Sequence, residues 1–190
     1  MSDHNVNIIV RHHDFDKHLL TNDICLISTT NNFEDQFIKR IPIAGPRYKY
    51  TAGDICTVYG FGVTDTMGNM ERSTEKLRKV HVKIIDIKKC IDAYQSRKTS
   101  QYNAYVSKET SLCAGWPEGG KDACKFDSGG PLVGNLNATT SVLIGIVSFG
   151  YDCGNANFPG VYTKVNQYVN WMLDFEKTRN IGTGAVFVNN

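Results

Sequence analysis

A serine and an aspartate stand in sequence settings that could support nucleophilic chemistry. Ser128 lies in the run Asp-Ser-Gly-Gly-Pro, whose glycines permit a tight backbone that exposes a hydroxyl and aims N–H groups at a developing oxyanion. Asp23 lies in Asn-Asp-Ile-Cys-Leu-Ile, at the mouth of an apolar strand where burial is costly without hydrogen-bond partners. Both are candidates for a hydrolytic site, unless Ser128 is a turn residue and Asp23 an exposed strand end.

The third component of such a site, a general base, has no clear candidate. A serine hydroxyl becomes a nucleophile when an imidazole removes its proton and a carboxylate orients that imidazole. His12, His13 and His18 are close to Asp23 in the sequence, and His81 falls in a later predicted strand. Each is better explained as a surface or hydrogen-bonded histidine. Use of His18 would require its ring to come within hydrogen-bond reach of the nucleophile. The sequence therefore predicts a site that lacks its catalytic histidine.

The residues around Ser128 resemble the nucleophile loop of trypsin/chymotrypsin-like serine proteases. The resemblance rests on Lys-Asp-Ala-Cys-Lys-Phe-Asp-Ser-Gly-Gly-Pro at 121–131, on the Asn-Asp-Ile around Asp23 and on Pro-Gly-Val-Tyr at 159–162. It extends over most of the chain, from about Ile8 to Leu173. It implies that Ser128 is in the place of the nucleophile and Asp23 in that of the triad aspartate. The family's Ala-Ala-His-Cys motif, which carries the histidine, has no counterpart in these residues.

The same resemblance implies a substrate pocket for basic side chains. Asp122 matches the carboxylate at the base of that pocket, where it would pair with an Arg or Lys of the substrate. Gly150 and Gly160 match the small residues that keep the pocket open, and Ser148 matches the hydrogen-bond partner of the triad aspartate. The expected partner is therefore a protein or peptide with basic side chains. Asp122 could instead be an ordinary turn residue in Gly-Lys-Asp.

Two further positions bear on activity. The family has a glycine two residues before the nucleophile, and this chain has Phe126 at that position. The backbone N–H groups of that position and of Ser128 would form the oxyanion hole. Loss of one oxyanion donor costs about 3–4 kcal/mol of transition-state stabilisation, although Phe126 could leave the backbone unchanged. Asp127 matches the aspartate that pairs with a newly cut N-terminal amine. Without that amine, Asp127 must find another donor, turn to solvent or bind a proton, and a disordered, zymogen-like pocket is expected.

Six cysteines are an even number, as is common in an oxidising compartment. Cys25 and Cys56 have no partner in the pattern of the family that the chain resembles. They either pair with each other or remain thiols. Thiols are favoured, because a disulfide requires a short distance between the two Cβ atoms, which the sequence does not indicate. No Cys-x-x-Cys or paired Cys/His spacing predicts a metal site, and no cofactor is expected. The resemblance implies two disulfides, Cys90–Cys113 and Cys124–Cys153.

Composition limits the remaining classes of function. The chain has 190 residues, 41% of them hydrophobic, which is ordinary for a globular protein. A formal net charge of +2 with interspersed signs predicts no nucleic acid or membrane partner. No apolar run is long enough for a membrane span, and no signal peptide is recognised at the start. The sequon at Asn137, with the cysteines, nevertheless favours a secreted, extracellular protein.

Short β-branched runs separated by turns repeat along the chain and predict an all-β fold. Apolar residues at helical spacing predict a single helix over Val165–Thr178. With the resemblance, the expected architecture is the trypsin-like double antiparallel β-barrel with a C-terminal helix and an incomplete first barrel. The expected parts are a remnant of the first barrel at 1–40, the second barrel with the nucleophile loop and pocket at 41–164, the helix at 165–180 and a frayed tail at 181–190. The expected strands are Val6–Val10, Asp23–Ser28, Ile41–Ile43, Ile55–Gly62, Lys79–Ile87, Leu132–Gly134, Leu143–Phe149 and Gly160–Val165.

These features lead to three hypotheses. The first is a secreted serine protease homologue that is catalytically inactive as it stands and acts by binding a protein, like the inactivated members of this family in parasitic mites. The second is that these residues are the C-terminal portion of an active endopeptidase that cuts after Arg or Lys. The third is a structural or adhesive β domain, which predicts no affinity for basic side chains.

Overall fold

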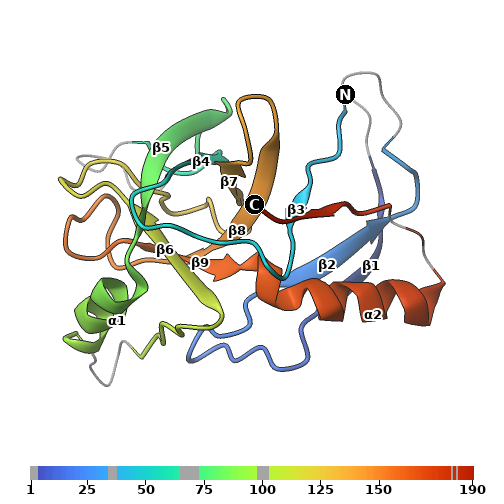
Figure 1. The fold of residues 1–190 in the computed structure, drawn as a ribbon, viewed down its shortest axis with the longest axis horizontal. Coiled ribbons are helices and arrows are strands. Elements are labelled where there is room, and N and C mark those ends of the chain that lie inside the picture. Colours follow the sequence, from blue (N-terminus) through green and yellow to red (C-terminus); the bar gives the residue numbers. More distant parts are fainter. Residues whose placement is uncertain (1–3, 34–37, 65–72, 98–102, 181, 183) are drawn as a thin grey trace.

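Antiparallel strands make up most of the protein, as the short β-branched runs predict (Figure 1). The structure is a computed structural model that describes residues 4–33, 38–64, 73–97, 103–180, 182 and 184–190. Its elements in chain order are β1 (Val6–Arg11), β2 (Cys25–Thr29), β3 (Ile43–Ala44), β4 (Ile55–Gly60), β5 (Arg78–Ile85), α1 (Ile87–Gln95), β6 (Ser111–Gly115), β7 (Pro131–Asn135), β8 (Ser141–Phe149), β9 (Gly160–Lys164), the 3-10 turn η1 (Val165–Tyr168), α2 (Val169–Arg179) and β10 (Phe187–Val188).

Six strands close into a barrel, which confirms the predicted fold class. Their order is β8-β7-β4-β5-β6-β9, and the additional pairing of β9 with β8 completes the ring. Side chains on these strands alternate between the interior and the surface: on β5, Val82 and Ile84 are buried, while Lys79 and His81 are exposed. The barrel interior is filled by large apolar side chains, among them Val82, Leu132, Ile144 and Tyr162.

The strands β1 and β2 form a separate antiparallel hairpin at the opposite end of the molecule from α1 (Figure 1). It belongs to residues 1–40, the part that the resemblance assigns to the first barrel. Its register places Ile9 opposite Ile27, and both side chains are exposed, at 64% and 58%. Ile24, directly before β2, packs instead against Tyr168 and Met172 at the C-terminal end of the chain. The start of β2 is therefore packed against η1 and α2.

The prediction of a single helix was wrong, because α1 follows β5 directly. Asp86 caps it: the side chain accepts a hydrogen bond of 3.1 Å from the N–H of Lys89. The buried face of the helix consists of Cys90 and Tyr94, one turn apart. With only nine residues, the segment has too few apolar positions for the helical period to stand out. The strand β6 was also not predicted.

The C-terminal helix is present, beginning with η1 and ending at Arg179, where Asn180 adopts a left-handed φ of 51°. The residues beyond it correct the expectation of a frayed tail. Over Phe187–Val188 they form β10, which pairs in parallel with β3 at the edge of the large sheet. The N–H groups of Ile43 and Gly45 donate to the carbonyls of Val186 and Val188, at 2.8 and 2.7 Å. The tail is therefore part of the fold.

Candidate functional site

Five residues that the resemblance assigns to the substrate pocket or to the nucleophile position line one cavity of about 240 Å³. They come from the loop before β7, from the end of β8 and from the start of β9, so the barrel brings together positions far apart in the sequence. Two of these positions are glycines. At Gly160 a side chain would fill the space beside the carboxylate of Asp122, because a Cβ there would lie 2.6 Å from Oδ1 of that residue. The five residues are Asp122, Ser128, Ser148, Gly150 and Gly160.

Asp122 lines this cavity, and its carboxylate is largely withdrawn from water. Oδ1 accepts a hydrogen bond of 2.8 Å from the N–H of Ala123, and Oδ2 accepts one of 3.2 Å from the N–H of Gly154. Burial, which disfavours the charged form, raises the pKa of Asp122 to about 7 in spite of these two bonds. A guanidinium or ammonium group that entered the cavity would restore the favourable environment of the ionised carboxylate.

The walls of the cavity are held by Tyr94 of α1 and by a disulfide. The Tyr94 hydroxyl donates to the carbonyl of Pro159 at 2.8 Å and accepts from the N–H of Tyr151 at 3.2 Å. It thereby links the segment before β9 to the segment after β8. Tyr94 carries no local signal in the sequence for this role, because only the unpredicted helix α1 brings it to this place. The disulfide Cys124–Cys153 joins the nucleophile loop to the same wall, and Cys90–Cys113 joins α1 to β6.

Asp23 lies where the resemblance places the triad aspartate, beside Ser148. The Ser148 hydroxyl donates a hydrogen bond of 2.7 Å to Oδ2 of Asp23, and the Thr163 hydroxyl donates one of 2.7 Å to its backbone carbonyl. Both donors are on barrel strands, so the barrel fixes the start of β2. Because Ser148 lines the same cavity as Ser128, the aspartate and the candidate nucleophile are on the same side of the barrel.

The histidines lie elsewhere among the described residues. His12 is buried against Tyr168 and Trp171, and burial lowers its pKa. His81 is exposed on β5, where its Nδ1 lies 3.0 Å from the Thr57 hydroxyl. His18 borders a surface hollow formed by the loop before β2. No described histidine ring is hydrogen-bonded to the Ser128 hydroxyl, and the lack of a catalytic base stays a prediction.

His12, His13 and Asp14 bring potential metal-binding atoms within 4.8 Å of one another, although the sequence analysis expected no metal site. The His13 Nε2 and an Asp14 oxygen are 3.2 Å apart. The rings of His12 and His13 are stacked, however, with an angle of 19° between their planes. Their nitrogen lone pairs lie in those planes, so they do not converge on one ion. The group is better described as a stacked pair beside a carboxylate.

Phe126 has a backbone conformation that suits glycine. Its φ is 72°, in the left-handed region where a side chain is strained, and its ring is 59% exposed. Among the described residues, neither the N–H of Phe126 nor that of Ser128 donates to a backbone or side-chain acceptor. The loop thus keeps two free N–H groups near Ser128, and places an aromatic ring next to them.

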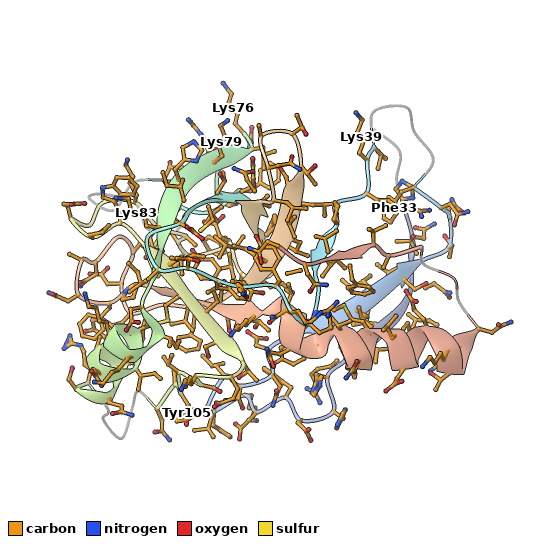
Figure 2. The ribbon with its side chains drawn as sticks, in the orientation of Figure 1. Phe33, Lys39, Lys76, Lys79, Lys83 and Tyr105 are labelled. Carbon is orange, nitrogen blue, oxygen red and sulfur yellow. A yellow bond between two sulfur atoms is a disulfide. The ribbon has the colours of Figure 1, made fainter. Side chains whose placement is uncertain are left out.

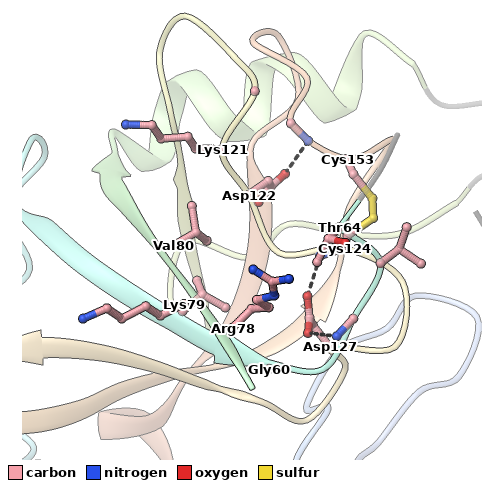
Figure 3. Close-up of a pocket in the computed structure, with 15 residues that line it drawn as sticks. Gly60, Thr64, Arg78, Lys79, Val80, Lys121, Asp122, Cys124, Asp127 and Cys153 are labelled. Atoms are coloured by element: carbon pink, nitrogen blue, oxygen red, sulfur yellow. Dashed lines mark hydrogen bonds between the residues drawn. A yellow bond between two sulfur atoms is a disulfide. The ribbon is translucent and has the colours of Figure 1, made fainter. Parts of the chain in front are cut away.

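Asp127 has found donors in the backbone, one of the outcomes that the sequence analysis left open. Oδ1 accepts from the N–H of Gly62 at 2.7 Å and Oδ2 from that of Cys124 at 3.0 Å (Figure 3). No side chain fits at Gly60 or Gly62, where a Cβ would come within 2.0 and 2.4 Å of the carboxylate. The disordered, zymogen-like pocket stays a prediction. Asp127 lines a second cavity, of about 390 Å³, which adjoins the first through Asp122.

The remaining predicted positions lie away from both cavities. Cys25 is an exposed thiol and Cys56 a buried one, so neither forms a disulfide, and burial raises the pKa of Cys56 to about 12. Asn137 is exposed in the turn between β7 and β8, where its Oδ1 accepts from the Thr139 hydroxyl at 3.0 Å. No helix in the described part of the chain is long and apolar enough to cross a membrane.

Comparison with known proteins decides the family. The family model described as Trypsin matches residues 2–172, which include the hairpin, the barrel and both cavities. The chain belongs to the trypsin family. Trypsin-1 of Astacus astacus is 39% identical to it over 168 residues, which are 88% of this chain and 65% of that protein. Trypsin II-P29 of Gallus gallus is 37% identical over 168 residues, 88% of this chain and 61% of the relative.

A third relative of this trypsin-family chain is the clotting factor G beta subunit of Tachypleus tridentatus, 41% identical over 118 residues. That match covers 62% of the chain and 37% of the relative. The chain thus spans less than two thirds of the length of these three relatives. The tail that forms β10 lies outside the family match, which ends at residue 172.

Proposed function

We propose that this trypsin-family chain binds a protein through a basic side chain that enters the Asp122 cavity, and that it hydrolyses its partner very slowly or not at all. The observation that carries the proposal is the pairing of an accessible acidic cavity with Phe126 at the position of the family's glycine. Asp122, Gly150 and Gly160 supply a carboxylate and the space in front of it. These features support the binding of a basic side chain.

Two features argue against efficient turnover. The exposed Phe126 ring stands beside the two free N–H groups near Ser128, where the carbonyl oxygen of a bound peptide would have to approach. The Ser128 hydroxyl also has no imidazole partner among the described residues, and without a base a serine is a poor nucleophile. The two disulfides are typical of an oxidising compartment, so the proposed partner is an extracellular protein.

Benzamidine, whose amidinium group mimics an arginine head group, tests the binding part of the proposal. We expect isothermal titration of the 190-residue chain to detect saturable binding, and the Asp122→Asn variant to abolish it. The matched control is Asp174→Asn, which removes an exposed carboxylate on α2. Absence of binding in the unchanged chain would favour a structural or adhesive β domain instead.

Turnover of an arginine-containing fluorogenic peptide tests the catalytic part. We expect the chain and its Ser128→Ala variant to give the same background rate. A rate that disappears on Ser128→Ala would establish an endopeptidase that cuts after Arg or Lys and would refute the proposed loss of catalysis. Because benzamidine binding is measured separately, either half of the proposal can fail alone.

A further inference from the structure

A basic surface borders the second cavity, on the side of the barrel formed by β5. We define it by Lys79 and Lys83 of β5 and by Lys121 of the loop before β7. Lys79 and Lys83 project from the outer face of β5 (Figure 2), and Lys79 and Lys121 line the cavity of about 390 Å³ (Figure 3). Three cationic side chains are thus gathered in one region of a chain whose formal net charge is only +2.

The strand β5 arranges part of this surface in a regular row. Lys79, His81 and Lys83 are alternate residues, so they point to the same side of the sheet, while Val82 and Ile84 point into the core. Successive side chains on one side of a strand are about 6.8 Å apart. The row is flanked on β4 by Ile55, which is opposite Lys83 and 57% exposed. The surface therefore offers a row of basic groups with an apolar residue beside it.

Trp116 holds two of the cations near each other. The Lys121 ammonium lies 3.7 Å from the centre of its indole ring and the Lys83 ammonium lies 4.9 Å from it. Gly115, directly before the tryptophan, pairs with Lys83 in the sheet, which accounts for this position. Two ammonium groups attracted to one ring repel each other, and an anion between them would relieve that repulsion.

No acidic side chain in the described part of the chain forms an ion pair with the basic surface. The ion pairs among the described residues are His13–Asp14, Lys88–Asp92 and Lys177–Asp174, none of which involves it. The two carboxylates that line the neighbouring cavity, Asp122 and Asp127, accept hydrogen bonds from backbone N–H groups and not from these lysines. The three lysines are therefore available to pair with carboxylates of a partner.

We propose that this basic surface binds an acidic segment of a partner protein in extended conformation. An extended peptide presents alternate side chains about 6.8 Å apart, which is the repeat of the row on β5. Two carboxylates four positions apart can therefore meet Lys79 and Lys83, and a side chain midway between them faces His81. The strand β5 is already hydrogen-bonded to β4 on one side and to β6 on the other, so the segment cannot extend the sheet there. It lies instead on top of the side chains of β5 and runs along the row. The surface is distinct from the Asp122 cavity and requires no catalysis.

Two octapeptides of identical composition test the match of spacing. In one, Glu and Ser alternate; in the other, the Glu residues form a single block. We expect fluorescence anisotropy to show tighter binding of the alternating peptide to the 190-residue chain, with affinity that falls as salt is added. The double variant Lys79→Glu, Lys83→Glu should weaken that binding by about tenfold or more, because each exposed ion pair contributes modestly and a reversed charge repels.

The control variant is Lys39→Glu, which makes the same charge change at an exposed lysine far from β5 (Figure 2). It should leave the affinity within about twofold, and circular dichroism should show that all variants are folded. Equal affinity for the two peptides, or tighter binding of a heparin oligosaccharide than of either, would overturn the proposal in favour of an unspecific polyanion surface. An equal loss on Lys39→Glu would overturn it as well. Benzamidine binding by the double variant separates this result from the fate of the proposed function.

Discussion

The Ser148 hydroxyl and the Asp23 carboxylate are 125 residues apart in the chain and are joined by a hydrogen bond of 2.7 Å. A hydrogen bond to a charged group contributes about 1.5–3 kcal/mol, and less where water competes. We expect Ser148→Ala to lower the free energy of unfolding by about 1–2 kcal/mol, measured by urea denaturation. Ser141→Ala, at the exposed start of the same strand, is the control and should change it by less than about 0.5 kcal/mol. Equal values for both variants would show that the bond to Asp23 is not stabilising.

The φ of 72° at Phe126 is an unfavourable backbone conformation for a residue with a side chain. A residue with a side chain in the left-handed region costs about 1 kcal/mol relative to glycine, whereas glycine is costly where φ is negative. We expect Phe126→Gly to raise the melting temperature by a few degrees. Lys125→Gly, at the preceding position, should lower it. A lower melting temperature for Phe126→Gly would mean that the ring makes a stabilising contact that outweighs the strain.

The raised pKa of Asp122 predicts that ligand binding depends on pH. Burial raises that pKa to about 7, so the carboxylate is mostly ionised at pH 8 and mostly protonated at pH 5. Benzamidine, which stays cationic over this range, should bind more tightly at pH 8 than at pH 5 by about tenfold or more in a titration series. Affinity that is constant between these values would place the pKa outside this range.

The Asp122 carboxyl also makes the free energy of unfolding depend on pH. Because the folded pKa of Asp122 is about 7 and that of an unfolded aspartate about 3.9, folding favours the protonated form. Its contribution is fully present below pH 4 and is lost as the pH rises from about 4 through 7. Asp122→Asn should remove this slope from urea denaturation measured across the range, whereas Asp174→Asn should retain it.

Tyr94 is expected to support the shape of the cavity. Tyr94→Phe removes the hydroxyl that links Pro159 to Tyr151, leaving a buried carbonyl and N–H without that partner. We expect a loss of about 1–3 kcal/mol in unfolding free energy and weaker benzamidine binding. Tyr50→Phe, which loses a bond of 3.3 Å to the Ile144 carbonyl in the main core, is the control. It should affect stability alone, and an equal loss of benzamidine affinity would show that the effect is not local.

The C-terminal strand should stabilise the whole chain. Deleting residues 185–190 removes β10 and leaves the N–H groups of Ile43 and Gly45 without their acceptors. We expect the deletion to cost about 2 kcal/mol or more. Phe187→Ala, which keeps the backbone bonds and removes one side chain from the cluster around Tyr168, should cost less. An unchanged urea midpoint after the deletion would show that the tail is dispensable.

The local chemistry of the site could be predicted from the sequence, because it resides in short runs of residues. Two glycines directly follow Ser128, and Asp122 lies in the same loop. The apolar residues that mark the strand after Asp23 are likewise its neighbours in the chain. The period of the β-branched runs likewise predicts the strands, since alternation along a strand is a local property. The family resemblance supplied the disulfide pairs and the barrel architecture, which spacing alone does not determine.

Only the tertiary structure decided which distant groups meet. The donors of Asp127, the role of Tyr94 and the position of β10 depend on segments separated by many residues, and no local pattern encodes them. The basic surface likewise arises because β6 carries Trp116 to the side of β5, where Lys121 joins Lys83. The sequence determines which side chains are present to interact. The closure of the barrel determines the distances between them and their exposure to water, and the strength of their electrostatic interactions depends on both.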